Sequence, residues 1–92
     1  NHGFVVFIEI ILDRTTANAL EQFAEAVKDI PEIMECHMIS GGFDFLLKIR
    51  CAHMDDFRKI SGQVLWKLHG VKETRSYPVM EVIKETRQMQ LK

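Results

Sequence analysis

The stretch Ile39-Ser40-Gly41-Gly42-Phe43-Asp44-Phe45, ISGGFDF, sets two glycines between two apolar segments. Glycine tolerates the positive φ angles that two-residue hairpin turns require, so Gly41-Gly42 predicts a tight hairpin. The two strands of that hairpin are expected over Glu32–Ser40 and Phe43–Cys51.

The register of this hairpin follows from counting outward from the glycines. Glu35 then lies opposite Lys48, which is a favourable cross-strand charge pair. One face of the hairpin is expected to be a core covered by helices, and it carries Met34, Cys36, Met38, Phe45, Leu47 and Ile49. The other face is partly apolar and partly charged, with Ile33, Glu35, His37, Ile39, Asp44, Leu46 and Lys48. An apolar patch rimmed by charges is typical of an interface, and the simplest partner is a second copy of the same sheet.

Two further strands are expected outside the hairpin. The segment Phe4–Leu12, FVVFIEIIL, is apolar at both odd and even positions, which indicates a central strand rather than one that is half exposed to water. A fourth strand is expected within Val71–Lys84. It contains Pro78, which lacks a backbone N–H, so this strand belongs at an edge of the sheet.

Two helices are expected between these strands. The first is capped by Asn18 together with Glu21, or by one of the preceding threonines, and it ends at Pro31. The second spans His53–Leu68 and is followed by Gly70 at the position that favours glycine after a helix. The order β-α-β-β-α-β predicts an α+β, ferredoxin-like fold, with two helices on one face of a four-stranded antiparallel sheet.

The composition limits what the chain can do. Its 92 residues make one domain, expected over residues 1–84 with a polar tail over 85–92. A net charge of −1 argues against nucleic-acid binding by this segment alone. No segment has the length of a membrane span or the pattern of a signal peptide. The 2 cysteines do not form a C-x-x-C motif, which indicates a reducing compartment, the cytoplasm.

The residue types present would suit a metal site, but their spacing argues against one. Cys36, His37, Cys51 and His53 are possible zinc ligands. The register sets Cys36 four residues along the sheet from Cys51, a separation of roughly 13 Å at ~3.3 Å per residue. That separation is too long for a disulfide and for one shared tetrahedral site. No cofactor is expected either.

The glycine turn and Asp44 have a structural and a functional interpretation. Backbone N–H groups beside a turn can hold a carboxylate, and Asp44 could pair with an ammonium group. A plain turn followed by a solvated carboxylate explains the same residues.

Several segments together resemble the C-terminal domain of leucine-responsive (Lrp/AsnC) transcription regulators. They are Val6–Ile10, Pro31–Ile33, Glu35–His37, Ser40–Lys48, His69–Val71, Thr74–Ser76 and Val79–Lys84. The resemblance implies a domain that senses amino acids, dimerises through its sheet and assembles into larger oligomers. It also implies an effector site between dimers, formed by Gly41, Gly42, Phe43, Asp44, Thr74, Arg75, Ser76 and Tyr77.

This chain has no helix-turn-helix, so DNA contact would come through a separate domain. We therefore expect a fragment of a regulator or a stand-alone sensing module, and not an enzyme. Two alternatives stay open. One is a small dimeric oxygenase or isomerase, in which His37 beside Glu35 would act. The other is a purely structural dimer module.

Overall fold

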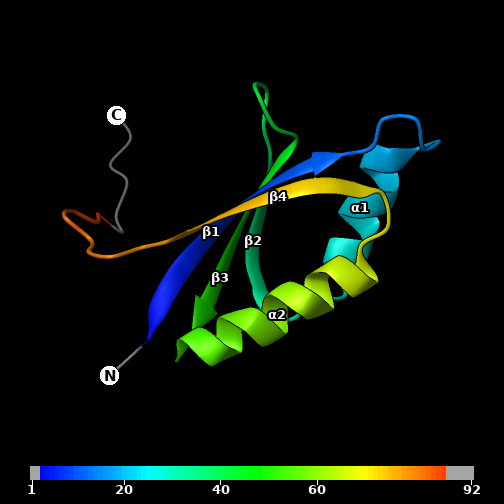
Figure 1. Cartoon of the computed structure of the whole chain (residues 1–92). Coiled ribbons are helices and arrows are strands. Elements are labelled where there is room, and N and C mark those ends of the chain that lie inside the picture. The colour runs from blue at the N-terminus through cyan, green and yellow to red at the C-terminus, as the bar shows by residue number, and fades with distance from the viewer. Residues whose placement is uncertain (1–2, 87–92) are drawn as a thin grey trace.

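The computed structural model describes residues 3–86, except for the side chains of residues 64 and 65. Four strands and two helices follow one another in the predicted order (Figure 1). They are β1 (Phe4–Leu12), α1 (Ala19–Val27), β2 (Ile33–Met38), β3 (Phe45–Cys51), α2 (Met54–Lys67) and β4 (Val71–Pro78). The ferredoxin-like fold is confirmed. Most of the tail expected over 85–92 lies outside the described residues.

The sheet has the strand order β2-β3-β1-β4, and the neighbouring strands are antiparallel. β1 is central, as its continuous apolar sequence predicts, and β4 with Pro78 is an edge strand, as predicted. Both helices pack against one face of the sheet (Figure 1).

The core lies between that face and the helices. Alternate residues of β1 and β3 supply its floor, and Phe23 of α1 packs its ring on Phe45 of β3 with 4.5 Å between ring centroids. Burying a side chain of this size contributes about 1.5–3 kcal/mol. The buried residues are Val6, Ile8, Ile10, Leu12, Ala19, Phe23, Val27, Ile30, Phe45, Leu47, Ile49, Cys51 and Leu68.

The predicted hairpin register is confirmed. Glu35 lies opposite Lys48, and the pairing continues to Met38 opposite Phe45. The predicted core of the hairpin is only half right, because Met34 and Met38 are 50% and 65% exposed.

The exposed methionines have two causes. β2 is an edge strand, and the buried residues of the sheet lie on β1 and β3 instead. A register shift between Ile33 and Glu35 also sets Ile33 opposite Ile49 and against the core, on the opposite face from the one predicted for it.

The prediction of a tight two-residue turn at Gly41-Gly42 is wrong. Ladder pairing stops at Met38 and Phe45, and neither Gly41 nor Gly42 has a positive φ angle. Asp44 instead donates its backbone N–H to the Ile10 carbonyl of β1 at 2.9 Å, and its own carbonyl accepts the Ile39 N–H at 2.9 Å. Asp44 is thus bonded on both sides, and the hairpin connection spans residues 40–43.

Asn18 is the N-cap residue of α1, as predicted, but it does not cap the helix with its side chain. Asn18 adopts a left-handed conformation, with φ 57° and ψ 33°, and its side chain makes no capping hydrogen bond. The side chain of Asp13 organises the approach to the helix instead, because it accepts hydrogen bonds from the Thr15 N–H at 3.0 Å and from the Thr15 hydroxyl at 2.6 Å.

Neither of the two helices within residues 3–86 lies on the second face of the sheet. Val5, Phe7 and Ile11 of β1 are half-buried there, and the Tyr77 side chain of β4 is 47% exposed. We call this surface the open face. Among residues 3–86, no helix is long and apolar enough to cross a membrane.

Candidate functional site

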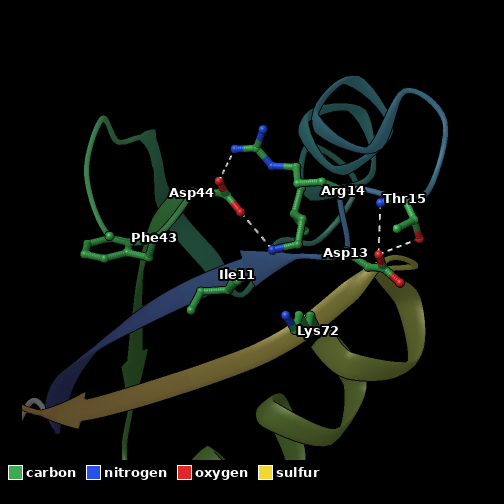
Figure 2. A pocket seen from close by; sticks show the side chains of 9 residues that line it. Ile11, Asp13, Arg14, Thr15, Phe43, Asp44 and Lys72 are labelled. Carbon is green, nitrogen blue, oxygen red and sulfur yellow. Dashed lines mark hydrogen bonds and ion pairs between the residues drawn. The ribbon is translucent and has the colours of Figure 1, made fainter.

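A hollow of about 520 Å³ lies where the β2–β3 connection meets the end of β1. In Figure 2, Phe43 and Asp44 stand on one side and Asp13, Arg14 and Thr15 on the other. The lining residues are Ile11, Leu12, Asp13, Arg14, Thr15, Gly42, Phe43, Asp44 and Lys72.

The centre of this hollow is the carboxylate of Asp44. Its Oδ2 accepts the backbone N–H of Leu12 at 2.8 Å, and its Oδ1 accepts a hydrogen bond from the guanidinium of Arg14 (Figure 2). The Asp44 side chain is only 11% exposed, whereas that of Arg14 is 63% exposed. The Arg14 guanidinium and the Leu12 N–H lower the pKa of Asp44 below its usual value, so the carboxylate is ionised at neutral pH.

Charges of both signs surround this ion pair. Asp13 supplies a second carboxylate, and its pKa is lowered by the hydrogen bonds from Thr15 and by the nearby charge of Lys72. Lys72 comes from the beginning of β4 (Figure 2). The hollow therefore offers two carboxylates and two cations at its lining.

The rest of the hollow is apolar or unobstructed. Ile11 and Phe43 supply apolar surface. A Cβ atom added to Gly42 would meet no atom within 4 Å, and one added to Gly41 would meet only the Ile39 side chain, at 3.9 Å. Neither backbone angles nor local crowding require glycine at these two positions.

The predicted site residues are only partly brought together within one chain. Gly42, Phe43 and Asp44 line the hollow, whereas Lys72 is the β4 residue that lines it. Thr74 and Ser76 pair with Ile10 and Ile8 and therefore share the helix-covered side of the sheet. Arg75 and Tyr77 pair with Glu9 and Phe7 and belong to the open face, where the Arg75 guanidinium bonds Glu73 at 2.8 Å. A ligand role for Thr74, Arg75, Ser76 and Tyr77 stays a prediction.

The sequence analysis missed Asp13, Arg14 and Lys72. A signal for them was present, since the predicted fold sets β1 beside β3 in an antiparallel pair. The end of β1 must then lie beside the start of β3, so the polar residues that follow Leu12 fall next to Asp44.

His37 and Glu35, which the enzyme alternative would use, form an exposed pair on β2. The His37 Nε2 lies 3.0 Å from a Glu35 oxygen, and Lys48 Nζ lies 3.4 Å from the other oxygen. These contacts lower the pKa of Glu35, with His37 contributing most. A carboxylate whose pKa is lowered by hydrogen bonds with His37 and Lys48 is a poor general base.

The two cysteines are separate free thiols. Cys51 is buried in the core and Cys36 is half-buried, and burial raises the pKa of both, which makes the thiols less reactive. Within residues 3–86, no three His, Cys, Asp or Glu side chains gather as a metal site would require.

Comparison with known proteins gives a consistent family result. The model of the family described as "Lrp/AsnC ligand binding domain" matches residues 5–89. The leucine-responsive regulatory proteins of Klebsiella pneumoniae and Escherichia coli K12 are each 46% identical over 90 residues, which is 98% of this chain. The chain spans only 55% of the length of those relatives.

Solved structures agree with this result. A transcriptional regulator from Neisseria meningitidis in complex with L-Met superposes with a TM-score of 0.84 at 31% identity, over 98% of this chain and 58% of that one. An AsnC family transcriptional regulator from Agrobacterium tumefaciens also gives a TM-score of 0.84, at 26% identity over the same shares of the two chains.

Proposed function

The chain belongs to the Lrp/AsnC ligand binding domain family, and from this premise we propose that it is the effector-binding and self-assembling part of a transcription regulator. Its effector would be a small zwitterion, an α-amino acid. The relatives that it matches are regulators, and one solved relative is a complex with L-Met.

The observation that carries this proposal is the mixed-charge hollow beside Asp44. An amino acid has an ammonium group, a carboxylate and a side chain close together. The hollow offers carboxylates from Asp13 and Asp44 and cations from Arg14 and Lys72 at its lining. A charged ligand group that leaves water needs a partner of opposite charge, so this combination suits a zwitterion better than a simple cation or anion.

The apolar part of the hollow narrows the ligand class. Ile11 and Phe43 would contact the side chain of the bound amino acid, and apolar surface gains about 25 cal/mol per Å² when it is removed from water. A branched aliphatic or thioether side chain fits this surface better than a charged one.

The two glycines of the hairpin connection support the same proposal. Gly41 and Gly42 are not needed for a positive φ angle or for local space. Glycine is also found where another molecule approaches the backbone closely. A bound ligand or a neighbouring copy would explain the two glycines in this way. We propose that Thr74, Arg75, Ser76 and Tyr77 complete the site from a neighbouring copy.

Self-association through the open face is the second part of the proposal. Val5, Phe7 and Tyr77 leave apolar surface on the open face, which neither α1 nor α2 covers. Val82 and Ile83, which follow β4, are 60% and 84% exposed. They line a second hollow together with Val5 and Phe7 of β1. A second copy would bury these surfaces in a two-fold contact.

DNA contact is assigned to another segment of a longer regulator. The relatives are nearly twice as long as the part that this chain matches, and the net charge of −1 gives this segment no excess of cations for phosphates. A regulator of this kind would act in the cytoplasm.

A direct test measures ligand binding and assembly together. The chain is titrated with a panel of amino acids while its thermal stability and its mass in solution are followed. Stabilisation by L-leucine or L-methionine, with a dimer or larger species, is the expected result. A monomer that no amino acid stabilises at millimolar concentration would contradict both parts of the proposal.

A further inference from the structure

We infer that the Arg14 guanidinium occupies the position on Asp44 that the ammonium group of the effector takes when it binds. A zwitterion then binds by replacing the Arg14–Asp44 ion pair with two new ones. The inference rests on the proposed function. Arg14 and the exchange of ion pairs would make the site select against molecules that carry only one of the two charges.

The carboxylate of Asp44 cannot be left without a partner. Its side chain is 11% exposed, and one oxygen is already used by the Leu12 N–H. A charge that is largely removed from water is costly unless it is paired and hydrogen-bonded. The second oxygen is paired with the cation of Arg14 in this structure.

Arg14, by contrast, can leave this contact at little cost. Its side chain is 63% exposed, and it comes from the connection after β1 rather than from a strand or a helix. An exposed guanidinium is well hydrated, so water compensates for the contact that Arg14 loses on release. Arg14 also lines the hollow itself, so after release it stays within reach of a ligand.

A zwitterion keeps every charge paired during the exchange. Its ammonium group takes the place of the guanidinium on Asp44, and its carboxylate is then available to Arg14 as a new partner. One ion pair is replaced by two, and no covalent bond is made or broken.

Molecules with a single charge fail for opposite reasons. An amine takes the place of Arg14 on Asp44, but it only exchanges one ion pair for another and makes no contact with the released guanidinium. A carboxylic acid can pair with Arg14 or with Lys72, but it makes no contact with Asp44 and adds only one of the two ion pairs. The exchange therefore favours a zwitterion over either half of it.

The experiment compares three probes of the same shape: L-leucine, isoamylamine, which lacks the carboxylate, and isocaproate, which lacks the ammonium group. Affinities are measured by calorimetry with the 92-residue chain and with the Arg14→Gln variant, which keeps a polar side chain and removes the charge. In the wild-type chain we expect L-leucine to bind at least about tenfold more tightly than either half-ligand, which is the effect of one charge-assisted contact.

In Arg14→Gln, isoamylamine no longer competes with a guanidinium, and L-leucine loses the partner of its carboxylate. The preference for L-leucine over isoamylamine should therefore fall about tenfold or more. The control is Lys28→Gln, which removes a cation from another exposed ion pair, with Glu25 at 2.9 Å, outside the hollow. This control should keep the wild-type preference.

The outcomes separate the two proposals. If the wild-type chain binds L-leucine and Arg14→Gln keeps the full preference over isoamylamine, the exchange is overturned while the effector function stands. If the wild-type chain binds neither L-leucine nor L-methionine, the effector function is overturned and the exchange falls with it.

Discussion

Asp44 and Leu12 are separated by 32 positions in the sequence, yet the Asp44 carboxylate accepts the backbone N–H of Leu12 at 2.8 Å. The main chain of Asp44 is tied to the same strand, through its N–H and the Ile10 carbonyl. The hairpin connection is therefore fastened to the end of the central strand by a side-chain bond and a main-chain bond. These two bonds give the candidate site its shape before any ligand arrives.

This double attachment predicts a difference between two substitutions of Asp44. Asp44→Ala removes the acceptor of the Leu12 N–H and the partner of Arg14, and it should cost about 1–3 kcal/mol of unfolding free energy. Asp44→Asn keeps an oxygen that can accept the Leu12 N–H and loses only the charge, so it should cost clearly less. Urea denaturation of both variants measures the difference. Equal losses would show that the Leu12 bond contributes nothing of its own.

The lowered pKa of Asp44 predicts a dependence of stability on pH. Because the pKa is lower in the folded chain than in the unfolded one, the ionised carboxylate stabilises the fold at neutral pH. That contribution should be lost as the pH falls below the ordinary aspartate value of ~4 toward the folded value. Denaturation at several acid pH values should give a shallower loss of stability for Asp44→Asn than for the wild-type chain. Parallel curves would contradict the assignment.

Two glycines outside the site should respond in opposite directions to alanine. Gly70 follows α2 with φ +85°, a left-handed angle that costs a residue with a Cβ atom about 1–2 kcal/mol, so Gly70→Ala should destabilise the chain. Gly62 lies inside α2 and a Cβ there would meet no atom within 4 Å, so Gly62→Ala should stabilise it by about 0.5–1 kcal/mol. The shift in thermal midpoint reports both signs, and a stabilised Gly70→Ala chain would refute the first.

Gly42→Ala separates folding from ligand binding. The added methyl group enters open space at an ordinary backbone angle, so the unfolding free energy should stay within about 0.5 kcal/mol of wild type. The same methyl group would stand at the wall of the hollow and hinder a ligand that approaches the backbone. We expect unchanged denaturation together with weaker binding of L-leucine in calorimetry. Unchanged binding would leave Gly42 as a plain connector.

A charged residue introduced on the open face should dissociate the oligomer. Phe7 is a half-buried residue of β1 on that face, so Phe7→Glu would force a carboxylate into the sheet-to-sheet contact, at a cost of several kcal/mol. The control is Met54→Glu, which alters a side chain that is 47% exposed at the start of α2. Light scattering should find smaller species for Phe7→Glu and the wild-type mass for Met54→Glu. A wild-type mass for both variants would exclude the open face as the interface.

The sequence alone determined the order of the elements and the register of the hairpin. Both depend on local patterns: the alternation of apolar residues, which has a period of two in a strand, and the count outward from Gly41-Gly42, which the Glu35–Lys48 pair supports. Pro78 likewise identified an edge strand, because the missing N–H is a property of that residue in any context.

The tertiary structure decided what the hairpin connection does. Gly41-Gly42 is compatible with a tight turn on local grounds, but the chain forms a wider connection there, and β1 binds Asp44 by a main-chain and a side-chain bond. The partner of Asp44 was equally out of reach of a local pattern. Arg14 and Asp44 lie far apart in the sequence and meet only because antiparallel pairing sets the end of β1 beside the start of β3. A charge pair of this kind is a product of topology, which no single stretch of the sequence encodes.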